Sequence, residues 1–257
     1  MGRELRLGGP PQRIVSLVPS LTEALFAFGA GERVVGVTRF CVEPRTGVRA
    51  RTKVGGTKNV DVAGVASLAP DMVIANVEEN TRDDVHRMIA AGLTVFLTYP
   101  RTVADAIDEL QQLAEIVGPS AEATAIVRAS RVALGEALRD KRPRARIFCP
   151  IWRDPWMTIG PDTYMHDLIT VCGGLNVFGE RNERYPSMEL FEIGALTPEV
   201  VLLPDEPYHF RKRHIPEVIE WAPAARIYLV DGKDLCWYGP RIPEGIRTVR
   251  GILRGES

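Results

Sequence analysis

The sequence predicts an α/β protein built from two similar lobes with mainly parallel sheets, joined by a single long helix. The first observation is a repeat, in which residues 67–75 return as residues 195–203 with the same order of helical tail, proline, acidic residue and apolar run. The second is that the flanks repeat as well, since residues 13–19 correspond to residues 145–150. The third is the alternation of predicted strands and helices, which is typical of parallel sheets covered on both faces.

Lobe one follows this alternation from its first strand. Its first helix is predicted to begin at Ser20, because Glu23 stands three positions later and would complete a capping box, and to end before Gly29. The Gly-, Arg- and Thr-rich residues 38–59 are predicted to form a loop. The predicted elements are strand 13–18, helix 20–28, strand 33–37, helix 61–69, strand 72–76, helix 82–91 and strand 94–98.

Two helices are predicted where the two copies join. Residues 102–117 are amphipathic and end at Gly118, and a longer helix covers about residues 120–140. At about 1.5 Å rise per residue the longer helix would span roughly 30 Å. A helical join is stiff, so we expect limited closure of the lobes. The predicted domains are an N-terminal lobe (1–118), an interlobe helix (119–141) and a C-terminal lobe (142–257).

Lobe two repeats the pattern of lobe one. Asp162 is predicted to cap its first helix, and Gly173 is predicted to end it. The predicted elements are strand 145–151, helix 162–172, strand 176–178, helix 190–196, strand 200–203, helix 215–221, strand 227–230 and helix 245–253.

Composition excludes several classes of partner. The net charge is −1 and the sequence has no block of like charge, which argues against nucleic-acid binding. The basic residues 141–144 are predicted to form a solvated turn. No apolar run of about 20 residues is present, so no membrane span is expected. The given sequence shows no signal peptide, so either the protein works inside the cell or its leader has been removed. Its four cysteines lack CxxC spacing and are predicted to be free thiols, which favours a cytoplasmic location. The chain is expected to be a monomer.

A candidate ligand site is expected at the carboxyl ends of the strands. Ligands bind there in open α/β sheets, and a cleft between two lobes is a preferred place for them. Five loops qualify, at residues 38–43, 76–80, 151–156, 205–210 and 234–241. Their aromatic side chains would stack on a planar or apolar ligand, or alternatively only plug the loops onto the lobe surface. The predicted contacts are Phe40, Cys41, Glu79, Trp152, Arg153, Trp156, Tyr208, His209, Trp237 and Tyr238.

Catalytic motifs are missing from the sequence. It contains no GxSxG, GxxxxGK[ST], HExxH or GxGxxG, and its four histidines lack metal-ligand spacing, so neither an enzyme nor a metal site is predicted. Two alternatives are weighed against this interpretation. Glu78 and Glu79 are candidates for acid–base groups, but adjacent loop carboxylates are more often solvated. Cys41 and Cys236 are candidates for contacts to a soft metal, but thiols buried in loops are common.

Several motifs, taken in order, resemble one known family over nearly the whole chain. They are PSLTE at 19–23, GVT at 36–38, VGGTKNVD at 54–61, LAPDMVI at 68–74, CGGLNVF at 172–178, YP at 185–186 and LTPE at 196–199. The chain resembles the class III (helical-backbone) substrate-binding proteins of ABC importers. It is most similar to the vitamin-B12-binding branch, in a superfamily that also carries ferric siderophores and haem.

The resemblance implies two Rossmann-like lobes in the class III periplasmic-binding-protein fold. It implies a non-catalytic protein that holds a corrinoid (cobalamin-like) or iron-chelate ligand in the interlobe cleft for an ABC importer. Cobalamin or another metal chelate would be the transported ligand and not a cofactor. The protein would then be periplasmic or extracytoplasmic, with its leader removed. The alternative is a cytosolic sensor, carrier or small-molecule enzyme that reuses the fold.

The resemblance also assigns individual residues. Tyr185 takes the position of an aromatic ligand contact in lobe two, whereas Thr57 falls where relatives carry a stacking tryptophan in lobe one. Family members dock on the arginines of a membrane permease through an acidic residue of each lobe. Asp61 takes this position in lobe one. In lobe two the matching residue is Phe191, with Glu189 and Glu192 beside it as candidates.

Overall fold

The computed structural model describes residues 8–140, 142 and 144–256. The first seven residues, Lys141 and Pro143 lie outside the described residues, and so do the expectations for the start of the chain and for those two positions of the basic turn. No helix within the described ranges combines the length and the apolar character needed to cross a bilayer.

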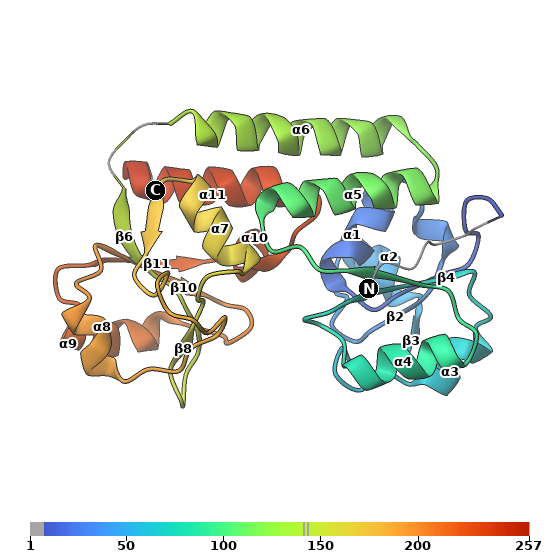
Figure 1. The fold of residues 1–257 in the computed structure, drawn as a ribbon, viewed down its shortest axis with the longest axis horizontal. Coiled ribbons are helices and arrows are strands. Elements are labelled where there is room, and N and C mark those ends of the chain that lie inside the picture. The colour runs from blue at the N-terminus through green and yellow to red at the C-terminus, as the bar shows by residue number, and fades with distance from the viewer. Residues whose placement is uncertain (1–7, 141, 143, 257) are drawn as a thin grey trace. The chain divides into compact units, whose positions relative to one another are not determined.

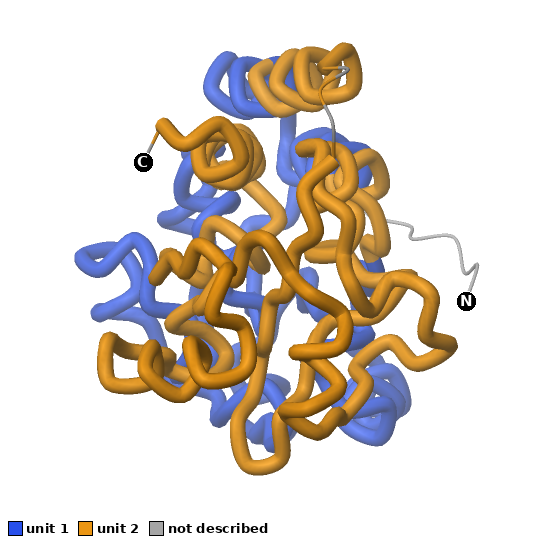
Figure 2. The backbone as a smooth tube through the Cα atoms, turned by 90° about the vertical axis from the view of Figure 1, so that its left-hand side faces the viewer, with its two compact units in different colours: residues 1–99, 107–128 blue, residues 100–106, 129–257 orange. Residues whose placement is uncertain are grey.

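The described chain divides into two compact units, drawn in blue and orange in Figure 2. Lobe one runs to Tyr99 and also includes Ile107–Arg128, and lobe two comprises Pro100–Ala106 and the chain from Ala129 onward. The chain changes unit three times, once directly after Tyr99 and once within each of the two helices that connect the repeats, so neither helix belongs to one lobe alone. These helices are α5 (Val103–Val117) and α6 (Ala121–Leu138) (Figure 1).

Lobe one contains a five-stranded parallel sheet with the order β3-β2-β1-β4-β5. In its register the central Ile14 lies opposite Val34 on one side and Met72 on the other. The strands are β1 (Ile14–Ser16), β2 (Val34–Val37), β3 (Thr52–Lys53), β4 (Met72–Asn76) and β5 (Val95–Thr98). The helices are α1 (Pro19–Ala27), η1 (Gly31–Arg33), α2 (Arg45–Arg49), α3 (Val62–Ser67) and α4 (Arg82–Ala90).

The strands of this sheet are covered on both faces. Val15 and Val73 pack against Val65 of α3 and Met88 of α4 in one hydrophobic cluster, and α1 lies on the opposite side of the strands (Figure 1). Every residue of β4 is buried, which explains why its sequence is an unbroken apolar run before Asn76. The prediction of an α/β fold with mainly parallel sheets is confirmed.

Lobe two contains a four-stranded parallel sheet with the order β11-β10-β6-β9 and a separate antiparallel hairpin of β7 and β8. The strands are β6 (Ala145–Phe148), β7 (Pro150–Trp152), β8 (Met157–Thr158), β9 (Gly174–Asn176), β10 (Val200–Pro204) and β11 (Arg226–Val230). The helices are α7 (Tyr164–Val171), α8 (Leu190–Ala195), η2 (Lys212–His214), α9 (Ile215–Trp221), α10 (Gly232–Cys236) and α11 (Ile242–Arg254).

The prediction of one strand over residues 145–151 is wrong. The chain leaves the parallel sheet at Cys149, and Pro150 begins the hairpin strand β7, which pairs with β8. Proline has no N–H to donate to the ladder of a central strand, so the parallel pairing ends before it. The hairpin carries Trp152 and leads to Trp156, two of the predicted ligand contacts.

Two predicted helix caps are also wrong. Helix α1 begins at Pro19, whose fixed φ suits the first turn, and Ser20 is a buried residue within the helix instead of its cap. Helix α7 is capped by Thr163, whose hydroxyl accepts a hydrogen bond from the N–H of His166 at 3.3 Å. Asp162 instead has φ 61° and lies outside the helix.

Two segments that are predicted as loops contain short helices or strands. The predicted loop 38–59 includes α2 and β3, and the predicted loop 234–241 begins inside α10, which Asp231 caps by accepting from the N–H of Lys233 at 2.9 Å. Strand β9 ends at Asn176, two residues before the predicted strand would end, because the Asn176 side chain accepts a hydrogen bond from the N–H of Phe178 at 3.1 Å and turns the chain.

Candidate functional site

The carboxyl edge of the lobe-two sheet carries a pair of aromatic side chains, of which Trp152 is exposed and Tyr208 is half-buried. Trp152, on the hairpin after β6, is 44% exposed, and its ring centroid lies 5.6 Å from that of Tyr208 in an edge-to-face arrangement. Tyr208 follows β10, so two loops that the sequence selects separately meet here. An edge-to-face pair fixes the ring orientations, and the exposed part of the Trp152 side chain stays available to a ligand.

Other aromatic residues on these loops belong to the core of lobe two. Trp156 is 6% exposed and stacks on Phe210 with centroids 5.8 Å apart. It also meets Trp221 edge to face at 5.8 Å. Burial on this scale holds the loops onto the sheet, which is the alternative that the sequence left open for these side chains. In this structure Trp156 packs the loop instead of facing outward.

Trp237 lies directly after α10, between charged side chains. Its indole N–H donates to the Glu206 carboxylate at 3.0 Å, and the cations of Lys233 and Arg241 lie 5.7 and 5.6 Å from its ring. Burial raises the pKa of Glu206, and the indole hydrogen bond opposes that rise. Trp237 is 7% exposed, so its role here is to anchor the Glu206 loop.

The remaining candidates of lobe two differ in what their side chains contact. Arg153 donates to both oxygens of Glu217, at 3.0 and 3.3 Å, so its charge is balanced within the lobe. Tyr238 is buried and meets Tyr164 edge to face at 5.9 Å. His209 is exposed after β10, and Tyr185 is 40% exposed.

Asparagines fix the carboxyl edge of lobe one. The Asn76 side chain accepts from the N–H groups of Glu78 and Glu79 at 2.7 and 3.1 Å. The Asn80 side chain accepts from the N–H of Asn76 at 2.9 Å and donates to the carbonyl of Thr57 at 3.0 Å. The predicted contacts Thr57 and Glu79 therefore lie on a loop edge whose backbone is tightly hydrogen-bonded.

Cys41 and Phe40 are neighbours with opposite environments. The Cys41 thiol is 1% exposed, lies 3.2 Å from the hydroxyls of Thr22 and Thr38, and has its pKa raised by burial. Phe40 is 51% exposed beneath the guanidinium of Arg39, 5.5 Å from its ring. Only Phe40 offers a surface contact. Among the described residues no cluster of histidine, cysteine or carboxylate side chains has the arrangement of a metal site.

The three acidic docking candidates have different partners. Asp61 is exposed and caps α3, with its carboxylate accepting from the N–H of Gly64 at 2.9 Å. Glu192 accepts from the N–H of Glu189 at 3.1 Å and pairs with Arg181 at 2.5 Å, and both contacts lower the pKa of Glu192. The charge of Glu192 is thus balanced within lobe two.

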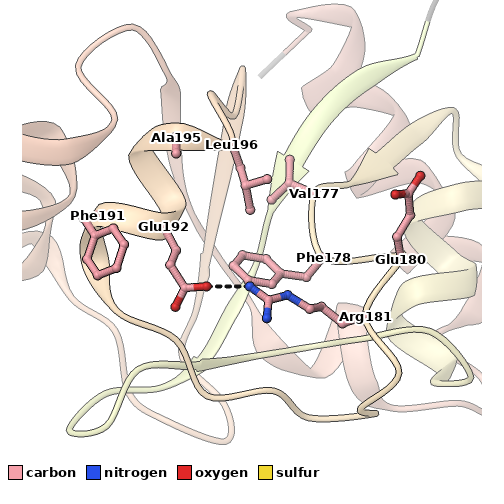
Figure 3. A pocket seen from close by; sticks show the side chains of 8 residues that line it. All are labelled: Val177, Phe178, Glu180, Arg181, Phe191, Glu192, Ala195 and Leu196. Carbon is pink, nitrogen blue, oxygen red and sulfur yellow. Dashed lines mark hydrogen bonds and ion pairs between the residues drawn. The ribbon is translucent and has the colours of Figure 1, made fainter.

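An open pocket of about 480 Å³ lies beside this ion pair. Figure 3 shows Phe191 of α8 on one side and Phe178 with Arg181 on the other, with Glu192 reaching toward the guanidinium. Phe191 is 75% exposed, the largest exposure among the large hydrophobic side chains of the described chain. This pocket does not contain the aromatic residues of the strand-end loops.

Sequence reasoning did not select several residues that shape these surfaces. Glu206 anchors Trp237, and Asn76 with Asn80 organises the lobe-one edge. Arg39 and Lys58 lie on the same edge, yet they sit in a segment that the sequence treats as one long loop. The available signal was the position of Arg39 just after a short strand, at the edge where ligands bind.

Comparisons with known proteins agree with this architecture. A periplasmic vitamin B12 binding protein of Vibrio cholerae, BtuF, superposes with a TM-score of 0.83 at 19% identity, covering 95% of this chain and 97% of that one. The apo periplasmic heme-binding protein RhuT of Roseiflexus sp. RS-1 gives 0.79 at 21% identity, covering 95% and 97%. At these identities the likeness establishes the fold, and it confirms the predicted class III fold.

Proteins that are similar in sequence belong to the same class as these structures. The vitamin B12-binding protein of Vibrio campbellii is 26% identical over 196 residues, covering 75% of this chain and 70% of the relative. The ABC transporter substrate-binding lipoprotein YvrC of Bacillus subtilis is 28% identical over 254 residues, covering 93% and 79%. The sequence profile of one family, described as periplasmic binding protein, matches residues 14–220. The chain therefore belongs to the periplasmic binding protein family.

Proposed function

We propose that the chain is the substrate-binding component of an ABC importer, and that its ligand is a metal chelate with a flat apolar face, of the corrinoid or haem kind. The observation that carries the ligand class is the Trp152–Tyr208 pair at the carboxyl edge of a parallel sheet, in which the Trp152 ring is exposed. Similar proteins are described as binding vitamin B12 or heme, which supports the same class of ligand. The proposed role is binding and release without covalent chemistry.

The proposal places the protein outside the cytoplasm and docks it on a permease. Two relatives of the family are described as periplasmic and another as a lipoprotein, which supports an extracytoplasmic location. For docking we favour Asp61 and Glu189 over Glu192, because both are exposed and only Glu192 is neutralised by an arginine of its own lobe. An Asp61→Lys variant is expected to keep its ligand affinity and to lose uptake in a reconstituted importer.

Titration calorimetry with cyanocobalamin and with iron(III) protoporphyrin IX tests the ligand class. We expect one of these ligands to bind, and Trp152→Ala to weaken its binding by about fivefold, because an aromatic stacking partner contributes on the order of 1 kcal/mol. Phe191→Ala is the matched control, since it removes an exposed ring of the same lobe that lies in the pocket of Figure 3. Its affinity should stay unchanged.

Two results would contradict the proposal at different points. If neither ligand binds at tens of micromolar, the ligand class is wrong. If a ligand binds and Trp152→Ala leaves its affinity unchanged, the aromatic pair is not the contact surface, while the importer role stands.

A further inference from the structure

Two cations lie without a carboxylate partner at the carboxyl edge of the lobe-one sheet. Arg39 is the second residue after β2, and Lys58 lies on the turn between β3 and α3. Both side chains are exposed, and within the described ranges neither forms an ion pair. Their hydrogen bonds go instead to neutral oxygens, from Arg39 to the Asn59 side chain at 3.0 Å and from Lys58 to the Glu78 carbonyl.

The turn that carries these cations is built to hold them in place. Gly55 has φ +93°, and an antiparallel β-bridge between Gly55 and Val60 joins the two ends of the turn. A Cβ at Gly56 would lie 2.4 Å from the Asn59 side-chain oxygen and 2.8 Å from the Arg39 guanidinium, so only glycine lets Arg39 lie against the turn. The cations are thus positioned before any ligand arrives, which lowers the ordering cost of binding.

The first carboxylate after the turn is engaged within its own helix start. Asp61 follows the turn, but its carboxylate is directed to the N–H of Gly64 at the start of α3. Lys53, at the end of β3, adds a further exposed cation whose ammonium donates to the Val48 carbonyl at 3.2 Å. In lobe two, by contrast, Arg153 directly after β7 is paired with Glu217.

An apolar surface lies directly beside the cations. Phe40 is 51% exposed and Val42 is 42% exposed, and the Arg39 guanidinium covers part of the Phe40 ring at 5.5 Å. The backbone N–H of Arg39 donates to the Gly55 carbonyl, and one guanidinium N–H donates to the Asn59 side chain. The other guanidinium N–H groups are available to donate to a planar carboxylate. The edge therefore combines an apolar contact with fixed positive charge.

We propose that this edge, defined by Arg39, Phe40 and Lys58, recognises an organic anion: Phe40 contacts the apolar face of the ligand, and the two cations bind its peripheral carboxylates. The inference rests on the proposed function and narrows its ligand class to metal chelates that carry free carboxylates. A neutral chelate of the same size gains only the apolar contact.

Calorimetry on the full chain separates the carboxylates from the ring. The probes are iron(III) protoporphyrin IX with free propionates, its dimethyl ester, cyanocobalamin and inorganic phosphate as a competitor. We expect the free acid to bind roughly tenfold or more tightly than the ester, as charge-assisted hydrogen bonds do, and to lose affinity as salt rises. Phosphate should compete only weakly, because it lacks the apolar face.

The decisive variant is the double substitution Arg39→Gln, Lys58→Gln. It should bind acid and ester equally, while the control Arg128→Gln, which removes an exposed arginine of α6, should keep the preference for the acid. Circular dichroism of the double variant confirms that it folds.

The outcomes separate the inference from the function on which it rests. Equal binding of acid and ester by the unmodified chain, or tighter binding of cyanocobalamin, overturns the inference and leaves the importer role intact. Strong binding of phosphate alone shows a free-anion site and also overturns it. No binding of any probe overturns both the inference and the proposed ligand class.

Discussion

Three of the four cysteines are buried too deeply to react. Burial raises the pKa of Cys149 and of Cys172 to about 12, and it raises the pKa of Cys41 as well. Cys236 alone is half-buried. The thiolate is the form that is oxidised, so a buried protonated thiol persists in an oxidising compartment. The cysteine content therefore does not argue for the cytoplasm, contrary to the inference drawn from the sequence.

Thiol labelling tests this interpretation. With Ellman's reagent at pH 8, the native chain is expected to expose a single reactive thiol, Cys236, and to release the other three only on unfolding, because burial covers those three thiols and raises their pKa values. Cys236→Ser should abolish labelling of the native state. Rapid labelling of a second cysteine in the native state would show that one of the buried positions opens readily.

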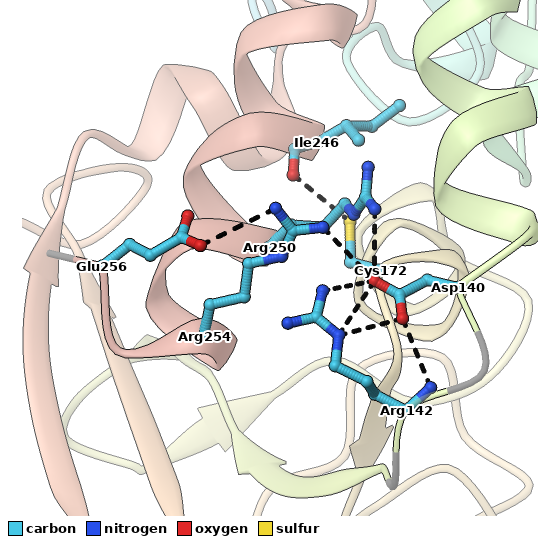
Figure 4. A network of polar contacts seen from close by, with 7 residues as sticks. All are labelled: Asp140, Arg142, Cys172, Ile246, Arg250, Arg254 and Glu256. Carbon is cyan, nitrogen blue, oxygen red and sulfur yellow. Dashed lines mark hydrogen bonds and ion pairs between the residues drawn. The ribbon is translucent and has the colours of Figure 1, made fainter.

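At the scale of elements, the end of α6 is fixed to α11 by one carboxylate. The Asp140 side chain, just after α6, accepts from Arg250 at 3.1 Å and from Arg254 at 3.4 Å, both on α11. It also accepts from Arg142 at 2.9 Å, as Figure 4 shows. These arginines hold the pKa of Asp140 far below its usual value. The contacts attach the linking helix to lobe two through charge.

Asp140→Asn is expected to lower the melting temperature by a few degrees at pH 7, because three arginines lose their shared acceptor charge. A depressed carboxyl pKa stabilises the fold above the unfolded value of about 4, and that stability is lost as the pH falls below it. The difference between variant and parent should therefore shrink below about pH 4. Thermal unfolding followed by circular dichroism across this pH range measures it.

Glu244→Gln provides the control for this prediction, since it removes an exposed pair with Arg247 on the same helix and should change the melting temperature little. If the Asp140→Asn variant has the same melting temperature as the parent at pH 7, the contacts of Asp140 with the arginines do not stabilise the fold.

Most elements were predictable because they depend on local patterns. The apolar run of β4 and the repeat that predicts β10 required no knowledge of tertiary packing. Which strand-end rings face outward was not predictable: Trp152 and Trp156 lie on one hairpin, yet only Trp156 is covered, by Phe210 from another loop. Loop-to-loop packing of this kind is not encoded in the periodicity of either segment.

At the scale of the whole molecule, the duplication is visible as a repeated set of contacts. In lobe one the Arg13 guanidinium donates to the Leu68 carbonyl at 2.6 Å, and the Asp71 carboxylate accepts from the N–H of Arg13 at 2.8 Å. These bonds tie the chain before β1 to the chain before β4. They explain why an acidic residue follows the proline in the repeat.

Lobe two forms the same contacts with different side chains. The Arg146 guanidinium donates to the Leu196 carbonyl at 2.5 Å, and the Glu199 carboxylate accepts from the N–H of Arg146 at 2.8 Å. The longer glutamate takes the place of the aspartate without changing the bond. The repeat in the sequence therefore corresponds to a junction between two neighbouring strands that both lobes share. The loops at the carboxyl ends of the strands differ between the lobes.

The same junction places a non-glycine residue in the left-handed region in each lobe, and this conformation can be tested. Ala69 has φ 44° and Thr197 has φ 42°, each directly before the proline of the repeat. The left-handed region costs an L-residue about 1–2 kcal/mol, more than the extra entropy that glycine loses on folding. Ala69→Gly and Thr197→Gly should therefore raise the free energy of unfolding by up to about 1 kcal/mol.

Urea unfolding with an unchanged m-value measures this effect, and the control is Ala66→Gly, an exposed residue within α3 with ordinary helical geometry. There glycine should lower the free energy of unfolding by about 0.5–1 kcal/mol. The opposite signs at Ala66 and Ala69, three residues apart, isolate the backbone conformation from the loss of a methyl group. If Ala69→Gly destabilises as Ala66→Gly does while Thr197→Gly stabilises, the two lobes do not share this turn.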